Sequence, residues 1–170
     1  LIYEGNKIVP YSVALQTGLS NFEATSNYQD VQDPAITVLF KIKNEETYLS
    51  AWTTTPWTLP SNMALIVNED IDYVLVHEKT KDIKFYIAKE RLESYKKGHD
   101  FEVLKELKGK DLLGIQYEPL FPYFRDQENE GAFQVISDNY VTTSDGTGIV
   151  HAAPAFGEDD NRVLKAHKIN

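Results

Sequence analysis

Cysteine is absent from the chain, and its 170 residues include one methionine. Without cysteine the protein has no disulfide scaffold, no thiol nucleophile and no cysteine-ligated zinc, and a reducing compartment is compatible with this. Long apolar runs are also missing: the longest clear one is Met63–Val67, far shorter than the roughly 20 residues of a membrane-spanning helix. These absences exclude a disulfide-stapled module and a membrane protein.

Basic residues are outnumbered, with 17 Lys and Arg against 26 Asp and Glu and a formal net charge of −9. This charge argues against wrapping a nucleic-acid backbone by broad electrostatic attraction. Lysines do gather locally, as at Lys96 and Lys97, but acidic residues are interleaved with them, which is typical of a solvated face. Only a local contact with nucleic acid is compatible with this composition.

The residues that are present describe one folded domain. Apolar residues make up 42% of the chain and charged residues 25%, as in folded proteins. A chain of this length buries roughly two-thirds of its unfolded surface, enough for one ordinary domain. Because it opens on Leu1 and has its only methionine at Met63, we expect a segment of a longer protein. The polar stretch 16–33 resembles a connector more than a core.

Alternating apolar residues predict short strands. Ile36–Lys41 and Thr47–Thr54 flank the turn Asn44–Glu46 and predict a hairpin. Many short strands without strand–helix alternation predict an α+β fold, a β-barrel-like domain with a few peripheral helices. The other expected elements are an extended stretch at Lys7–Ser12, a second hairpin from Tyr73–His77 and Ile83–Ala88, strands at Phe101–Leu107 and Phe133–Ser137, and helices at Lys89–Lys97 and Glu158–His167.

A threonine-rich segment follows the first predicted hairpin. The alternation of a strand places Thr53 and Thr55 on one face and Thr54 on the other, and Pro56 then ends the ladder. Two hydroxyls are thereby directed together. The alternative is that the threonines are simply good strand residues and that the prolines form a turn.

Glycines mark a second segment, Asp145–Asp160. Gly146 and Gly148 flank Thr147 and would let a ligand approach the backbone closely. The third glycine of a dinucleotide-binding fingerprint is missing, so Rossmann binding is not expected. Gly109-Lys110 does not form a phosphate loop either, because the upstream glycine and the following Ser or Thr are absent.

Ionisable residues occur in the same segment. His151 lies among small residues, where its ring has room to face a cavity, although a lone histidine is often a satisfied core or surface residue. Glu158, Asp159 and Asp160 follow Gly157 and suit the start of a helix. No metal-ligand spacing and no nucleophile–base pair stands out. We therefore expect no metal, and water as the nucleophile of any hydrolysis.

Together, the two segments resemble the editing domain of isoleucyl-tRNA synthetases, often called connective peptide 1. The resemblance rests on TTTPWTLPSN (53–62) and GTGIVHAAPAFGEDD (146–160), which match the family at full motif length and in order. The stretches Ser20–Glu23, Asp33–Pro34 and Tyr117–Phe121 look like the eukaryotic cytosolic branch. Valyl and leucyl relatives share the architecture but usually carry Arg at or near the position of Pro56.

The resemblance implies hydrolysis of valine mischarged on isoleucine tRNA, at the ester that joins the amino acid to the terminal adenosine. The two amino acids differ by one methylene, worth only about 1–3 kcal/mol in a binding pocket, as is known for isoleucyl-tRNA synthetases themselves, so a second sieve is needed. HIGH-like and KMSKS-like signatures are absent from the chain. We therefore expect one editing domain over residues 1–170, with residues 1–33 partly a connector to a catalytic domain outside the chain.

Site roles follow from the same resemblance. The threonine peptide matches the family's binder of the terminal adenosine and ester, and Asp160 matches the carboxylate that receives the substrate α-ammonium. His151 matches the residue at the side-chain pocket, where it admits valine and obstructs isoleucine; a role as general base is the alternative. The expected catalytic residues are Thr53, Thr54, Thr55 and Asp160, and the expected substrate-binding residues are Trp57, Asn62, Gly146, Thr147, Gly148, His151 and Asp160.

The implied partners are the 3′ end of aminoacylated isoleucine tRNA, its valine moiety or valyl-adenylate, and the rest of a parent synthetase, with no membrane. No cofactor is expected in this domain, whereas the parent would use ATP and magnesium. The implied localisation is cytoplasmic. The alternatives are an editing domain of a valyl- or leucyl-type relative, or a non-catalytic ligand-binding β-barrel.

Overall fold

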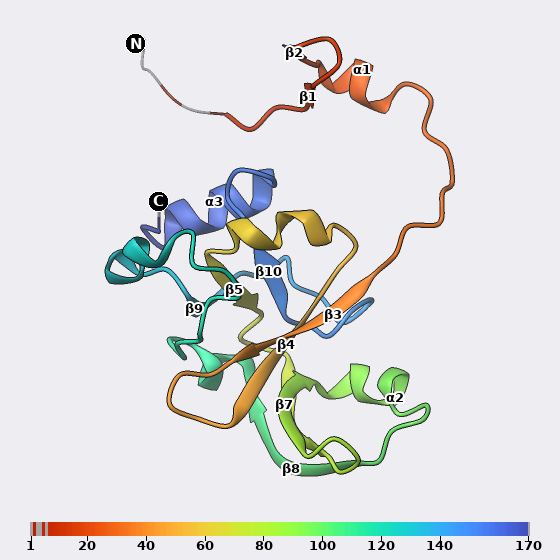
Figure 1. Cartoon of the computed structure of the whole chain (residues 1–170), viewed down its shortest axis with the longest axis vertical. Coiled ribbons are helices and arrows are strands. Elements are labelled where there is room, and N and C mark those ends of the chain that lie inside the picture. Colours follow the sequence, from red (N-terminus) through yellow and green to blue (C-terminus); the bar gives the residue numbers. More distant parts are fainter. Residues whose placement is uncertain (1, 3–4, 6, 170) are drawn as a thin grey trace.

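The computed structural model describes residues 2, 5 and 7–169, and their strands form three sheets (Figure 1). The five-stranded sheet has the order β3 (Ile36–Lys41), β4 (Thr47–Thr53), β7 (Ile83–Ala88), β6 (Asp72–Glu78) and β8 (Phe101–Lys108). The three-stranded sheet has the order β10 (Val150–Ala152), β5 (Ala64–Val67) and β9 (Gln134–Ser137), and the two-stranded sheet joins β1 (Tyr11–Ser12) to β2 (Thr17–Gly18).

Helices are short and lie around the sheets (Figure 1). The α-helices are α1 (Asn21–Thr25), α2 (Leu92–Tyr95) and α3 (Glu158–Ala166). The 3₁₀ helices are η1 (Pro56–Ser61), η2 (Lys89–Arg91), η3 (Gly109–Leu112) and η4 (Arg125–Glu130). The predicted α+β fold is confirmed, and within the described residues each sheet stays open, so the barrel-like expectation holds only as mixed sheets that curve around a core.

Both predicted hairpins are present. Strands β3 and β4 pair antiparallel with Val38 opposite Ala51, and β6 and β7 pair antiparallel with Val74 opposite Ile87. A parallel pairing of β4 with β7 then joins the hairpins into one sheet. Local alternation carries no information about this pairing, because it connects strands that are distant along the chain.

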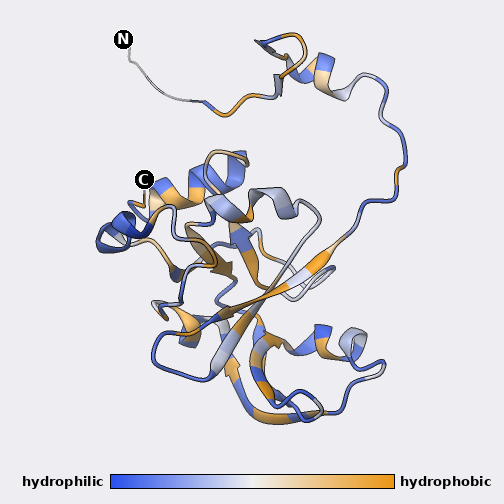
Figure 2. Ribbon diagram, in the orientation of Figure 1, coloured by the Kyte–Doolittle hydropathy of each residue, from blue (hydrophilic) through white to orange (hydrophobic). Residues whose placement is uncertain are grey.

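The five-stranded sheet is covered on both faces. Alternate residues such as Phe40, Leu49 and Tyr73 belong to the main core, which also contains β5, β9 and α3. The intervening residues, such as Phe85 and Ile87, form a smaller second core beneath α2. Figure 2 shows the apolar residues gathered in the strands and the hydrophilic ones in the connecting loops.

Several elements differ from the sequence-based expectations. The helix expected over Lys89–Lys97 is shorter, consisting of η2 followed by α2 and ending at Tyr95. Of the extended stretch Lys7–Ser12, only β1 pairs as a strand. Strands β5 and β10 were not predicted, because a short apolar run does not distinguish a buried strand from a helix segment.

The segment before β3 leads away from the sheets, and β1, β2 and α1 lie apart from them beyond the end that carries α3 (Figure 1). Its described residues are almost all exposed, and its helix α1 buries no residue. The expected connector role of 1–33 stays a prediction, and part of that range lies outside the described residues. Among the residues described, no helix combines the length and apolar character needed to cross a membrane.

Candidate functional site

A cavity of about 280 Å³ lies where four elements meet. Strand β4 ends there and continues into η1, while β10 lies antiparallel to β5 with His151 opposite Leu65. Helix α3 begins shortly after β10 and contributes its first turn. The residues that line the cavity are Trp52, Thr53, Thr54, Thr55, Thr58, Val150, His151, Phe156 and Asp160.

The hydroxyls of Thr53 and Thr55 lie together as expected, but a turn brings them together and not strand alternation, because β4 ends at Thr53. Thr54, which was expected on the opposite face, also lines the cavity. The hydroxyl oxygens of Thr53 and Thr55 lie 3.3 Å apart, and the Thr55 backbone N–H donates to Thr53 Oγ1 at 3.0 Å. Thr53 is buried, whereas Thr54 and Thr55 are exposed at the cavity. Pro56 opens η1 immediately afterwards, so the strand cannot continue.

A chain of hydrogen bonds fixes the ring of His151. The Tyr117 hydroxyl donates to Asn62 Oδ1 at 2.6 Å, which leaves the Asn62 Nδ2 group to donate to Ala64 O at 2.9 Å and to His151 Nδ1 at 3.1 Å. Because Nδ1 accepts, the ring proton is on Nε2, which donates to Thr58 Oγ1 at 2.8 Å. The Thr58 hydroxyl donates in turn to Thr55 O at 2.9 Å.

His151 is neutral at physiological pH. Burial lowers its pKa to about 4, because the charged ring is poorly solvated there. Both ring nitrogens are already engaged within the protein. The ring therefore presents a fixed, uncharged surface to the cavity and has no free lone pair with which to accept a proton from water.

Asp160 faces the cavity from the first turn of α3. Its Oδ2 accepts the Ala153 backbone N–H at 2.9 Å, and among the described residues Oδ1 receives no hydrogen bond. Burial raises the pKa of Asp160, and the nearby charge of Asp159 adds to this, although the Ala153 hydrogen bond opposes it. The start of a helix favours the ionised form of a carboxylate, but burial is the larger effect on Asp160. A cation in the cavity would restore that preference.

Four expected binding residues lie away from the cavity wall. Trp57 is 66% exposed on η1. Thr147 is buried, and its hydroxyl donates to Ser50 O at 2.6 Å. Gly146 and Gly148 have φ of +65° and +76°, and a Cβ would lie 3.0 Å from the Trp52 side chain at the first and 2.5 Å from the Ala88 Cβ at the second. The two glycines thus admit neighbouring protein atoms rather than a ligand.

Asn62 is also absent from the wall, but it contacts His151 from behind. The family resemblance also implies a supporting role for Asn62, and this placement fits that role. Sequence reasoning gave no role to Thr58 and Tyr117, which complete the hydrogen-bond chain. Thr58 could have been found from its place three residues after Thr55 in the threonine segment, whereas nothing in the local sequence singles out Tyr117.

The arrangement suits a substrate that carries a cation, held beside uncharged hydroxyls and an uncharged ring. Asp160 offers one free carboxylate oxygen, the paired hydroxyls of Thr53 and Thr55 can donate or accept, and His151 supplies a rigid wall. Within the described part of the chain, no three His, Asp or Glu side chains are grouped as metal ligands. The expectation that the site uses no metal stays a prediction.

Residues 1–149 match the family of the class I tRNA synthetases (I, L, M and V). The chain is 59% identical to the isoleucine–tRNA ligase of Bdellovibrio bacteriovorus over 163 residues, which are 94% of this chain and 15% of that protein. It is 54% identical to the cytoplasmic isoleucine–tRNA ligase of Saccharomyces cerevisiae, with the same coverage of 94% and 15%. The chain thus spans about 15% of the length of these relatives, which are bacterial as well as eukaryotic.

Solved structures with a similar fold include GlLeuRS-CP1, with a TM-score of 0.66 and 19% identity over 78% of this chain and 59% of that one. The cytosolic leucyl-tRNA synthetase editing domain of P. knowlesi has a TM-score of 0.63 and 13% identity, covering 79% of this chain and 63% of that one. At such low identity the similarity concerns the fold alone. It shows that the chain folds as these editing domains do.

Proposed function

The chain belongs to the class I tRNA synthetases (I, L, M and V), and from that premise we propose that it is the editing domain of an isoleucyl-type enzyme and hydrolyses valine mischarged on isoleucine tRNA. The isoleucine assignment is supported by the 48–59% identity to isoleucine–tRNA ligases. The observation that carries the hydrolytic part is the cavity in which Asp160, the paired threonine hydroxyls and the neutral His151 meet.

The substrate ammonium binds the free Oδ1 of Asp160 in a charge-assisted hydrogen bond. This contact places the ester carbonyl beside Thr53 and Thr55, whose hydroxyls orient the carbonyl and the attacking water. The water oxygen bonds to the carbonyl carbon and gives up a proton, the bond from that carbon to the ribose oxygen breaks, and the leaving ribose oxygen takes up that proton to become a hydroxyl. The products are free valine and uncharged tRNA.

His151 selects the substrate by its shape. Its Nδ1 and Nε2 are both engaged and its ring is neutral, so a role as wall fits better than a role as general base. The ring leaves room for valine and overlaps the extra methylene of isoleucine. Valyl-adenylate has the same ammonium and side chain and is a second substrate of the same class.

Within a parent synthetase, the 3′ end of the tRNA is the part that enters this cavity, so the acidic net charge of −9 presents little obstacle. We expect no cofactor in this domain, while ATP and magnesium serve the parent's catalytic domain. The cytoplasm is the corresponding localisation.

Replacing Asp160 tests the proposal. Asp160→Asn retains the size and an acceptor for the Ala153 N–H but removes the charge, so deacylation of preformed valyl-tRNA should fall by about 10- to 150-fold, the equivalent of a hydrogen bond to a charged group. Glu158→Gln is the matched control, because Glu158 is exposed in the same turn of α3, does not line the cavity and is not among the groups that shift the pKa of Asp160. Single-turnover deacylation measures both. Wild-type rates for Asp160→Asn would refute the assignment, and a wild-type chain without activity within its parent enzyme would favour a non-catalytic domain.

A further inference from the structure

Arg91 holds the loop that leads into β10, although it lies outside the cavity lined by the threonines and Asp160, here called the first cavity. The loop comprises residues 143–148, and β10 follows it and carries His151 to the cavity wall. The proposed hydrolysis assigns no role to Arg91. Its contacts therefore need a separate explanation.

The guanidinium of Arg91 donates to backbone carbonyls of that loop. Its Nε donates to Gly146 O at 2.9 Å, and its Nη1 donates to Ser144 O at 3.1 Å and to Thr143 O at 3.5 Å. A guanidinium is a planar fork of five N–H donors, so one arginine can hold several carbonyls at once. A lysine ammonium at this position could not reproduce that geometry.

Residues next to Arg91 attach the same loop at both of its ends. The Ala88 backbone N–H donates to Thr147 O at 2.8 Å. At the other end, the Thr143 hydroxyl donates to Glu90 Oε2. The end of β7 and the helix η2 therefore run alongside the loop, and Arg91 supplies the contacts in its middle.

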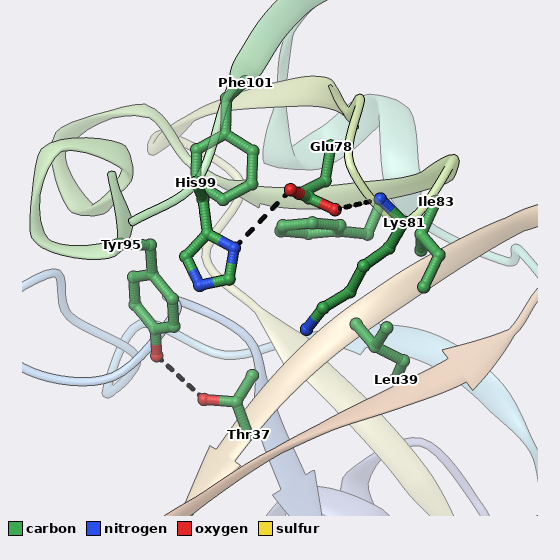
Figure 3. Close-up of a pocket in the computed structure, with 9 residues that line it drawn as sticks. Thr37, Leu39, Glu78, Lys81, Ile83, Tyr95, His99 and Phe101 are labelled. Atoms are coloured by element: carbon green, nitrogen blue, oxygen red, sulfur yellow. Dashed lines mark hydrogen bonds and ion pairs between the residues drawn. The ribbon is translucent and has the colours of Figure 1, made fainter. Parts of the chain in front are cut away.

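The loop packs against Trp52, the residue before the threonines. A Cβ on Gly146 would lie 3.0 Å from Cβ and Cε3 of the Trp52 side chain, so the loop backbone contacts that side chain directly. Thr37 pairs with Trp52 across β3 and β4, and its hydroxyl shares a hydrogen bond of 3.0 Å with the Tyr95 hydroxyl of α2 (Figure 3). The segment of η2 and α2 thus bears on Trp52 from two directions.

Trp52 and Thr53 are consecutive residues of β4 and point to opposite faces of the sheet. On the face of Trp52, Thr37 and Tyr95 belong to the wall of a second cavity, of about 170 Å³, which lies over the smaller core (Figure 3). On the other face, Thr53 lines the first cavity. Contacts that hold Trp52 therefore also fix the place of the Thr53 hydroxyl.

We propose that Arg91 is a positioning residue of the first cavity, an inference that rests on the proposed function for its effect on the reaction. By holding the loop against Trp52, Arg91 fixes both the end of β4, where the threonine hydroxyls lie, and the start of β10, where His151 lies. Without Arg91 the loop moves independently, and Thr53 and His151 lose their relative placement. A displacement of about 1 Å can slow a reaction by about a hundredfold.

Single-turnover deacylation of valyl-tRNA by the parent synthetase tests the effect on the reaction. Arg91→Ala should lower the rate constant at saturating enzyme by about ten- to a hundredfold. The enzyme concentration that gives half of the maximal rate should not change, because Arg91 lies outside the cavity that holds the substrate. Arg91→Lys keeps the charge without the fork and should recover only part of the rate.

Lys89→Met is the matched control. Lys89 lies in the same helix η2, but its ammonium pairs with Glu106 of β8 at 2.7 Å and not with the loop. Its replacement removes one positive charge from η2, as Arg91→Ala does, and should leave the rate constant at the wild-type value.

Chemical rescue separates positioning from a general loss of stability. Millimolar guanidinium should restore part of the activity of Arg91→Ala, because the ion carries the donors of the missing group. Urea has a similar planar shape without the charge and should not restore it. If Arg91 only stabilised the fold, neither compound would raise the rate, since both weaken the folded state.

Hydrogen exchange in the same parent enzymes tests the positioning without reference to the reaction. In Arg91→Ala, the backbone amides of residues 143–148, 52–55 and 150–151 should exchange at least about tenfold faster than in the wild type, as expected when a local contact opens. The amides of β6, which pairs with β7 and β8, should exchange as in the wild type and so show that the domain is folded.

Either of two results overturns the inference. One is a wild-type rate constant for Arg91→Ala. The other is faster exchange in the loop alone, with residues 52–55 and 150–151 unchanged. A wild-type parent that does not hydrolyse valyl-tRNA would instead refute the proposed function, and exchange at residues 52–55 and 150–151 would then decide the role of Arg91.

Discussion

At the scale of single residues, the protonation of His151 links the site to stability. Its folded pKa is lowered to about 4 from 6.5, so between these pH values the unfolded chain binds more protons than the folded one. The contribution of the neutral His151 ring to the free energy of unfolding is complete above about pH 6.5. It is lost as the pH falls towards the folded pKa.

We therefore expect acid to weaken the fold through this residue. Between pH 7 and pH 4 the free energy of unfolding should fall by about 3 kcal/mol more in the wild type than in His151→Gln, which does not titrate. Urea denaturation at a series of pH values measures the difference. Identical pH dependence in both proteins would show that His151 is not held neutral by burial.

Two of the buried tyrosine hydroxyls, those of Tyr117 and Tyr140, give a second prediction. Tyr117 donates to Asn62 Oδ1, so Tyr117→Phe leaves a buried acceptor unsatisfied and should lower the free energy of unfolding by about 1–3 kcal/mol. The Tyr140 hydroxyl is buried and finds no hydrogen-bond partner among the described residues, so Tyr140→Phe should be neutral or stabilising. Chemical denaturation of the pair is the measurement. Equal losses would mean that the Tyr117 bond adds nothing to the fixed orientation of Asn62.

The local sequence predicts contacts between residues close along the chain, but it does not predict contacts between distant residues. The pairing of Thr53 with Thr55 is local, because the residues are two positions apart, and a turn after the end of β4 forms it. The contact of Thr58 with His151 joins residues 93 positions apart, and that of Tyr117 with Asn62 joins residues 55 apart. Such contacts depend on which strands pair, and the local sequence does not encode that.

At the scale of elements, the two glycines after Asp145 act in packing. Gly148 has φ +76° and a Cβ there would lie 2.5 Å from the Ala88 Cβ, whereas Gly114 has φ +75° with no atom within 4 Å. Both positions have a positive φ that strains a non-glycine residue. Comparing the two substitutions therefore isolates the cost of the close contact between a new Cβ and Ala88.

Gly148→Ala should therefore destabilise the fold by about 1–3 kcal/mol more than Gly114→Ala, the usual cost of overpacking. Thermal or chemical unfolding of both variants provides the comparison. If the two substitutions cost the same, the close approach of this loop to β7 would not contribute to placing β10 and His151.

Elements were predicted where the pattern was long and alternating, as in the hairpins of β3–β4 and β6–β7. Strands β5 and β10 are four and three residues long and β5 is wholly buried, so they show no alternation. Their pairing nevertheless carries His151 to the threonines. The helix expected over 89–97 contains strong helix formers, yet only Leu92 is buried in α2, so little packing stabilises a longer helix.

At the scale of the whole molecule, one five-stranded sheet separates two cavities of different chemistry. The first has a carboxylate, hydroxyls and a neutral imidazole, and the second has a carboxylate and an ammonium between aromatic walls. The carboxylate of Asp160 faces the first cavity, whereas Oε1 of Glu78, at the second cavity, is buried with His99 Nδ1 3.6 Å away. The net charge of −9 favours a cationic group at the first cavity, whereas a nucleic-acid backbone gains nothing from it.

The measurement that tests the account most directly is single-turnover deacylation of valyl- and isoleucyl-tRNA by His151→Ala in its parent synthetase. If His151 acts as a wall, its removal admits the extra methylene while Asp160 and the threonines still hold the ester. Isoleucyl-tRNA hydrolysis should then rise by about one to two orders of magnitude, the equivalent of roughly 1–3 kcal/mol of steric exclusion, while valyl-tRNA hydrolysis falls less. An unchanged ratio with both rates reduced by about a hundredfold or more would instead identify His151 as a general base and contradict the account.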